Sequence, residues 1–90
     1  MLEGKIVIIN RLGLHARAAA KLVKTAERFE SRILITNEDG SLTVNAKSIL
    51  SVLTLAAWRG KTLRLSAEGP DEESAFTTVL RLFESGFGEE

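Results

Sequence analysis

The sequence contains no cysteine and only one histidine, and these two scarcities exclude several classes of site. Without cysteine, the 90-residue chain has no disulfide, no thiolate nucleophile and no zinc site built on sulfur ligands. A single histidine also excludes a histidine-rich metal site. Stability must therefore come from apolar burial. A chain of this length supports one modest core, which predicts a single domain over residues 1–90.

Long apolar runs and an excess of one charge are also missing. No stretch approaches the roughly 18 apolar residues of a membrane-spanning helix, so we expect no membrane insertion. Twelve basic residues balance twelve acidic ones, which disfavours nucleic acid as a partner. The first residues lack the basic and apolar segments of a signal peptide, and we therefore expect a cytoplasmic location.

Several familiar enzyme motifs are absent as well. The sequence has no glycine-rich phosphate loop, no dinucleotide fingerprint and no nucleophile elbow. Its two aspartates, Asp39 and Asp71, fall in expected turn or cap positions, which argues against a paired-carboxylate active site. Because the chain is too small to enclose a typical substrate pocket, we expect neither a bound cofactor nor a stand-alone enzyme.

The hydrophobic periodicity alternates between two and 3.6 residues, as is typical of an α+β domain. The expected elements, in chain order, are strand 5–10, helix 14–28, strand 32–37, strand 41–45, helix 47–58, strand 61–67 and a last helix that starts at residues 69–73. The strands alternate apolar and polar residues, which favours antiparallel pairing with one dry face. We predict a two-layer open-faced β-sandwich of order β-α-β-β-α-β-α, with four antiparallel strands and three helices on one face.

The helix expected over residues 47–58 is apolar around much of its circumference. Such a helix is either deeply buried or leaves part of its surface as an exposed apolar patch. The pattern alone leaves both alternatives open.

His15 is the only side chain that titrates near neutral pH, and it lies at or just before the start of the first expected helix. The free backbone N–H groups and the helix dipole at that position favour a neutral ring and any anion placed on it. Arg17 follows two residues later with a guanidinium group suited to phosphate. The pair fits a phosphohistidine site, and the alternative is a histidine that only caps the helix.

Ser48 precedes the second expected helix and is predicted to be its N-cap. A phosphate on an N-cap serine is compatible with the helix dipole. It would also place negative charge beside Ile49, Leu50 and Leu53, where it would oppose docking if these residues form an apolar patch.

Two motifs connect these residues to a known family. Residues 13–17 (GLHAR), followed by an alanine-rich helix, and residues 45–50 (NAKSIL) resemble the HPr family of histidine-containing phosphocarriers of the bacterial phosphoenolpyruvate phosphotransferase system. The helix start at residues 69–73 and the tail at residues 86–89 are also similar. The resemblance covers essentially the whole chain and implies the same open-faced sandwich fold and a monomer.

The resemblance implies a role for each candidate residue. His15 would accept a phosphoryl group on Nδ1 from enzyme I, which is charged by phosphoenolpyruvate, and would pass it to an enzyme IIA-type acceptor. Arg17 would stabilise the transferring phosphoryl group. Ser48 matches the regulatory serine that a dedicated kinase modifies in some bacteria. The implied docking surface consists of Ile49, Leu50 and Leu53, with Ala20 and Lys24 contributing from the first helix.

Two alternatives to a sugar-system carrier stay open. Ala18 stands where sugar-branch members usually have proline, and residues 45–48 look more like the nitrogen-related branch, in which the carrier reports metabolic state. The other alternative is an interaction module with the same order of elements and no phosphate chemistry.

Overall fold

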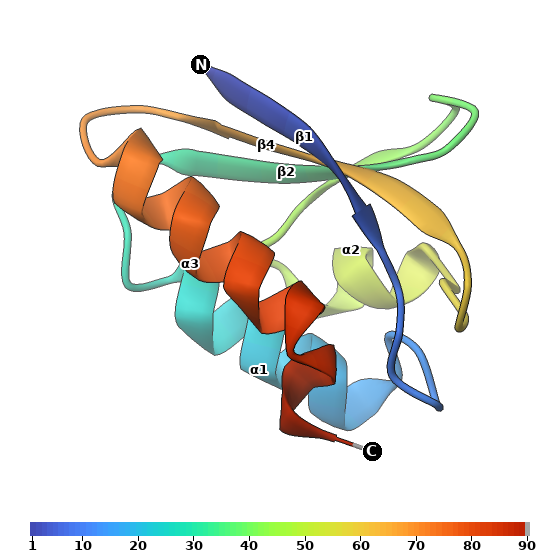
Figure 1. Ribbon diagram of the computed structural model, residues 1–90. Helices are drawn as coiled ribbons and strands as arrows, with labels where there is room; N and C mark the ends of the chain where they lie inside the picture. The colour runs from blue at the N-terminus through green and yellow to red at the C-terminus, as the bar shows by residue number, and fades with distance from the viewer. Residues whose placement is uncertain (90) are drawn as a thin grey trace.

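The computed structural model describes residues 1–89, and its four strands form one antiparallel sheet of order β1-β4-β2-β3. The elements are β1 (Leu2–Val7), α1 (Ala16–Ala26), β2 (Arg32–Asn37), β3 (Thr43–Asn45), α2 (Ile49–Thr54), β4 (Thr62–Glu68), α3 (Glu72–Glu84) and a 3₁₀ turn, η1 (Gly86–Gly88). The three α-helices cover one face of the sheet (Figure 1), which confirms the predicted α+β open-faced sandwich. Within residues 1–89, no helix is long and apolar enough to cross a membrane.

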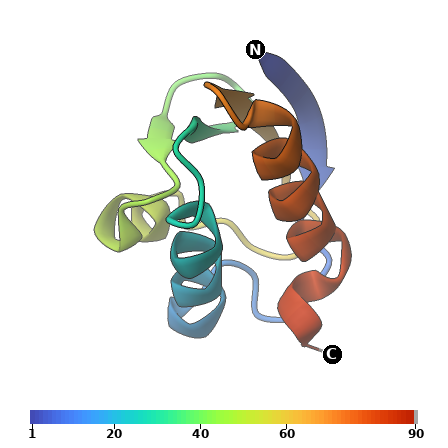
Figure 2. The same ribbon diagram turned by 90° about the vertical axis from the view of Figure 1, so that its left-hand side faces the viewer.

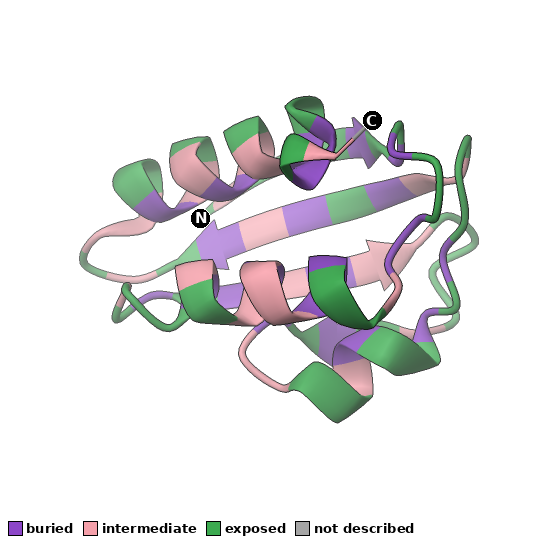
Figure 3. Ribbon diagram, turned by 90° about the horizontal axis from the view of Figure 1, so that it is seen from below, coloured by how far each residue is buried: buried purple, intermediate pink, exposed green. Residues whose placement is uncertain are grey.

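The core lies between the sheet and the helices. Ile33 and Ile35 of β2 are fully buried, as are Leu63 and Leu65 of β4. Their alternation with more exposed residues produces the one dry face that the sequence pattern predicts. Figure 2 shows α1 between α2 and α3, and in Figure 3 the buried parts of the helices face the sheet.

The first strand begins and ends earlier than residues 5–10, because its partner β4 fixes the register. Leu2 pairs with Ala67, and the pairing continues residue by residue to Val7 opposite Thr62. Gly4 has a low strand propensity, which hides the start of the strand in the sequence. Because glycine has no side chain, it leaves room for the Phe76 ring of α3. A Cβ atom there would lie 3.0 Å from Cζ of Phe76.

The second helix is shorter than residues 47–58. It ends at Thr54, and Ala56 then adopts a left-handed conformation with φ of 47°. A residue with this φ cannot continue a right-handed helix, so the chain turns toward β4. The first helix is shorter as well. It covers Ala16–Ala26 rather than residues 14–28.

Asp71 ties the start of α3 to the loop between α1 and β2. Its Oδ1 accepts hydrogen bonds from the Ser31 backbone N–H, at 2.9 Å, and from the Ser31 hydroxyl. Its Oδ2 accepts from the Glu30 backbone N–H at 3.0 Å. These bonds, with the Ser31 hydroxyl bond first, hold the pKa of Asp71 below its usual value.

We expect Asp71→Asn to destabilise the protein at pH 7, because the amide is a weaker acceptor for three donors. Since the folded pKa is lowered, the carboxylate's contribution is complete above about pH 4 and disappears as pH falls through the folded pKa. The stability difference between wild type and variant should therefore narrow from pH 4 downwards, as measured by urea unfolding.

Asp39→Asn is the matched control, because the Asp39 carboxylate accepts only within its own turn, from the Ser41 N–H. We expect a smaller loss of stability for this variant at pH 7. If Asp71→Asn lowers the free energy of unfolding by the same amount at pH 7 and at pH 2.5, the assigned role of the carboxylate is contradicted.

Candidate functional site

His15 is the N-cap of α1, as its position in the sequence predicts. Its backbone is extended, with φ of −79° and ψ of −178°, and its carbonyl oxygen accepts the first helical bond from Ala19 N–H at 2.8 Å. The imidazole Nδ1 accepts a hydrogen bond from the Arg17 backbone N–H at 3.3 Å. The ring nitrogen therefore lies directly at the free amides of the first helical turn.

The loop before His15 is held by a close backbone approach. Gly13 has a φ of +68°, and a Cβ atom there would lie 2.4 Å from the Ala57 carbonyl oxygen. The same carbonyl accepts the Leu14 N–H at 2.9 Å. Only glycine meets both requirements, so the segment that follows α2 determines where α1 and its cap begin.

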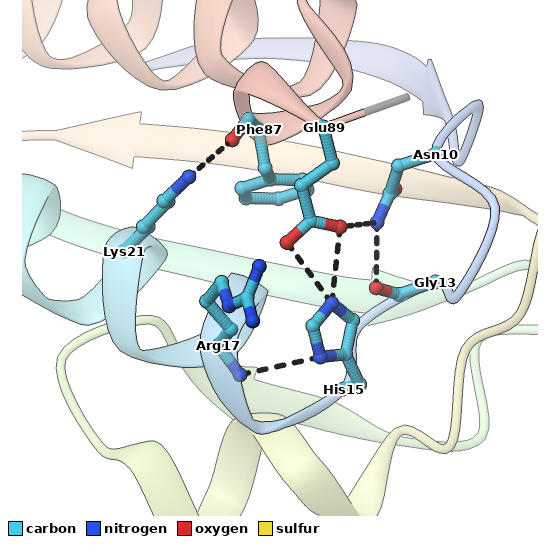
Figure 4. Close-up of polar contacts among 7 residues, drawn as sticks. All are labelled: Asn10, Gly13, His15, Arg17, Lys21, Phe87 and Glu89. Carbon is cyan, nitrogen blue, oxygen red and sulfur yellow. Dashed lines mark hydrogen bonds and ion pairs between the residues drawn. The ribbon is translucent and has the colours of Figure 1, made fainter.

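The other side of the ring faces a carboxylate from the far end of the sequence. Figure 4 shows the Glu89 side chain over His15, with each carboxylate oxygen 3.0 Å from Nε2. The Asn10 amide nitrogen donates to Glu89 at 3.2 Å and to the Gly13 carbonyl oxygen at 2.8 Å. The hydrogen bond with His15, followed by that with Asn10, holds the pKa of Glu89 below its usual value.

Cationic side chains surround this pair. Arg11, Arg17 and Lys21 line a shallow hollow together with Glu89. The Lys21 ammonium group donates to the Phe87 carbonyl oxygen at 2.6 Å, which fixes the chain next to Glu89. Three cations against one carboxylate make the hollow suitable for an anionic group. Among residues 1–89, no three His, Cys, Asp or Glu side chains gather to hold a metal ion.

Ser48 is the N-cap of α2, which confirms the predicted position. Its hydroxyl oxygen accepts from the Ser51 N–H at 3.4 Å, and its hydroxyl group donates to the Ser51 hydroxyl oxygen at 3.0 Å. The side chain is half-buried. It stands at one end of α2, while the loop that supports His15 follows the other end.

The structure decides between the two alternatives for the second helix. Val52 is buried, but Ile49, Leu50 and Leu53 are 39%, 75% and 37% exposed, so the helix leaves an apolar patch on the surface. On the neighbouring α1, Ala20 is half-buried and Lys24 is exposed. The five residues implied as a docking surface therefore lie on two adjacent helices (Figure 2).

Leu12 and Trp58 are exposed apolar residues of the two loops that meet at Gly13. Leu12 is 66% exposed and Trp58 is 63% exposed. The Trp58 backbone packs against Gly13, and the Lys61 ammonium group lies 4.3 Å from the centre of the indole ring. This contact between a cation and an aromatic face holds the ring on the surface of the loop.

Sequence reasoning missed the groups that complete the site, namely Glu89, Asn10 and Lys21. The signals for Glu89 are the resemblance of the tail at residues 86–89 and the spacing of Gly86 and Gly88 around Phe87, which permits a left-handed turn after the last helix. That turn brings the tail back, but the sequence does not show which side chain it will contact.

Comparisons with known proteins show what this chain is similar to. A family model described as PTS HPr component phosphorylation site matches residues 2–85. The chain is 43% identical over its whole length to the phosphocarrier protein HPr of Xylella fastidiosa, covering 99% of that protein. It is also 38% identical over 94% of its length to the phosphocarrier protein NPr of Escherichia coli K12, covering 93% of that protein.

Solved structures show the same fold. The crystal structure of HPr-C-His from Thermoanaerobacter tengcongensis superposes with a TM-score of 0.93 at 47% identity, covering all of this chain and 99% of that one. A crystal structure described as an HPr dimer from the same organism has a TM-score of 0.77 at 46% identity, with coverage of 99% and 100%.

Gly13→Ala tests the close approach that holds the His15 loop. Gly40→Ala is the matched control, because Gly40 has a similar φ of +78° but nothing within 4 Å of its Cβ position. We expect Gly40→Ala to cost about 1–2 kcal/mol of unfolding free energy from backbone strain alone. Gly13→Ala should cost about 1–3 kcal/mol more, because the backbone must also shift.

Urea unfolding of both variants measures the difference. If the two variants lose the same free energy, the contact between Gly13 and the Ala57 carbonyl does not constrain the loop.

Proposed function

The chain belongs to the HPr family, the phosphocarriers of the phosphotransferase system, and on that premise we propose that His15 carries the phosphoryl group. The proposed donor is enzyme I, charged by phosphoenolpyruvate, and the proposed acceptor is a protein of the enzyme IIA type. We place this exchange in the cytoplasm and assign it to sugar uptake.

One observation supports this proposal above the others, the placement of His15 Nδ1 at the amides of the first turn of α1. The Arg17 N–H is already aimed at Nδ1 from 3.3 Å. A phosphoryl group on Nδ1 would carry its oxygens into reach of such free N–H donors. The ring is also accessible, since about a quarter of its side-chain surface is exposed.

The transfer needs no acid or base from this chain. We propose that the donor group on enzyme I is itself a phosphohistidine. The lone pair of unprotonated Nδ1 then forms the new N–P bond while the donor's P–N bond breaks, and the electron pair of that bond stays on the donor histidine. The phosphoryl group moves between the two nitrogens, and no proton has to leave His15. Such a transfer depends on in-line placement and on charge stabilisation rather than on proton transfer.

Arg17 and the neighbouring cations supply the charge stabilisation. The Arg17 guanidinium is exposed and lies beside the imidazole (Figure 4). With Arg11 and Lys21 it lines the hollow next to the ring. A guanidinium group binds phosphoryl oxygens in a bidentate manner, so we assign Arg17 to the transferring group.

Docking of both partners is assigned to the patch formed by Ile49, Leu50 and Leu53, together with Ala20 and Lys24. An apolar centre beside a basic residue suits a small, transient interface. Ser48 begins the same helix, so its phosphorylation by a dedicated serine kinase would add charge next to the patch. We propose that this modification weakens docking.

A second candidate is a regulatory carrier of the nitrogen-related branch. The observation that favours it is Ala18, which lies fully buried in the first turn of α1, together with the 38% identity to the phosphocarrier protein NPr. The fold and His15 are compatible with either branch, so the donor decides between them. For the assembly we propose a monomer, and the relative described as an HPr dimer makes the oligomeric state a necessary check.

The central test is phosphorylation with phosphoenolpyruvate and enzyme I of the sugar type or of the nitrogen type, followed by mass spectrometry. We expect one acid-labile phosphate on His15, and the faster donor assigns the branch. His15→Ala should abolish acceptance completely while the circular dichroism spectrum stays unchanged. Acceptance by His15→Ala, or no modification of the folded wild type by either donor, would overturn the proposal.

Ser48→Asp tests the regulatory role of the cap. Aspartate is itself a good N-cap, so α2 should remain folded while negative charge is added beside Ile49 and Leu50. We expect the affinity for enzyme I to fall about tenfold or more in a calorimetric titration, since charge in an apolar interface is costly.

Ser74→Asp is the matched control, because Ser74 is exposed in the first turn of α3. An aspartate there adds the same charge on a helix that is not part of the patch. This variant should bind enzyme I like the wild type. Equal affinity for Ser48→Asp and Ser74→Asp would mean that Ser48 only caps the helix.

A further inference from the structure

The tail after α3 is built to return toward α1. Gly86, Phe87 and Gly88 all have positive φ, of 62°, 59° and 72°. This conformation costs little at the two glycines but strains the backbone at Phe87. The cost is offset because the Phe87 ring is buried and packs edge-on against Phe83, with 4.8 Å between ring centroids.

The returning tail is fastened on both sides of its turn. The Lys21 ammonium group holds the Phe87 carbonyl oxygen at 2.6 Å, and the Asn10 amide donates to the Glu89 carboxylate at 3.2 Å. The Glu89 side chain is consequently only 13% exposed, although it lies five residues beyond the end of α3. A strained segment that is fastened in this way at a candidate site suggests a function for the side chain it delivers.

The two ring nitrogens of His15 have partners of opposite kind. At Nδ1 the partner is the Arg17 N–H, a donor, so Nδ1 must offer a lone pair. At Nε2 the partner is the ionised Glu89 carboxylate, an acceptor, so Nε2 must carry the proton. Both contacts therefore select the same neutral tautomer, in which only Nδ1 can attack phosphorus.

We propose that Glu89 is a positioning residue of the phosphocarrier site, which fixes the His15 ring and its Nε2–H tautomer so that Nδ1 faces the phosphoryl donor. The inference rests on the proposed function, because it assigns a task in the transfer to His15. It extends that function by giving the tail of the chain a part in the chemistry.

The contact between His15 Nε2 and the Glu89 carboxylate persists through the proposed transfer. When Nδ1 bonds to phosphorus, Nε2 keeps its proton and remains a donor to Glu89. The Arg17 N–H, in contrast, has to leave the Nδ1 lone pair and is then free for a phosphoryl oxygen. Glu89 thus holds the ring in place while the opposite side of the ring exchanges partners, in the way that a carboxylate orients an imidazole in other sites.

The tautomer can be measured without any donor protein. Since the chain has one histidine, every imidazole signal in a two-bond ¹H–¹⁵N spectrum belongs to His15. For the neutral ring of the wild type we expect one protonated nitrogen, Nε2, and one unprotonated nitrogen, Nδ1. In Glu89→Gln the amide can turn either its oxygen or its NH₂ group to Nε2, so only the Arg17 N–H at 3.3 Å from Nδ1 still favours the Nε2–H tautomer. The Nδ1–H tautomer should therefore gain population relative to the wild type.

The second readout is the single-turnover rate of phosphoryl acceptance from phosphorylated enzyme I. We expect Glu89→Gln to accept about tenfold more slowly, the usual scale for loss of an orienting partner. Glu84→Gln is the matched control, since Glu84 is an exposed acid at the end of α3. It should keep both the tautomer and the rate of the wild type, and thermal unfolding should show that both variants are folded.

An unchanged tautomer in Glu89→Gln would overturn the proposal, whatever the rate. A changed tautomer with an unchanged rate would equally overturn the role in transfer. If the folded wild type accepts no phosphoryl group, the proposed function fails, and the tautomer measurement alone then decides whether Glu89 orients the ring.

Discussion

The position of His15 depends on the approach of Gly13 to the backbone of Ala57, which is closer than any residue with a side chain permits. That approach sets the Leu14 N–H against the Ala57 carbonyl and so determines where the first turn of α1 begins. The cap, the free amides and the ring orientation all follow from that starting point. A local backbone contact between two loops therefore places the imidazole to which we assign the phosphoryl transfer.

The short helix α2 both packs into the core and forms part of the exposed apolar surface. Its buried residue Val52 attaches it to the core, while Ile49, Leu50 and Leu53 remain on the surface. A helix of six residues has little intrinsic stability, so it relies on the Ser48 cap and on packing for its existence. A modification of that cap would thus act where the apolar surface and the helix meet.

Much of this arrangement can be predicted from the sequence. The alternating strands specify one dry face, residues 32–37 form the second strand with the predicted bounds, and both caps lie where His15 and Ser48 indicate. The extent of β1 could not be predicted, because Gly4 is a poor strand residue whose value comes from contact with Phe76. The contact of Glu89 with His15 spans 74 residues, and no local pattern encodes a pairing at that distance.

The hydrogen bond between Asn10 and Glu89 joins residues 79 positions apart, which affects the order in which the site forms during folding. During synthesis the His15 loop leaves the ribosome long before residue 89 does. Until residue 89 has emerged, the imidazole lacks its carboxylate partner, and the contact forms only when the turn after α3 docks. Non-local contacts of this kind form late in folding, so the imidazole should gain its carboxylate partner only after the sheet and the helices have packed.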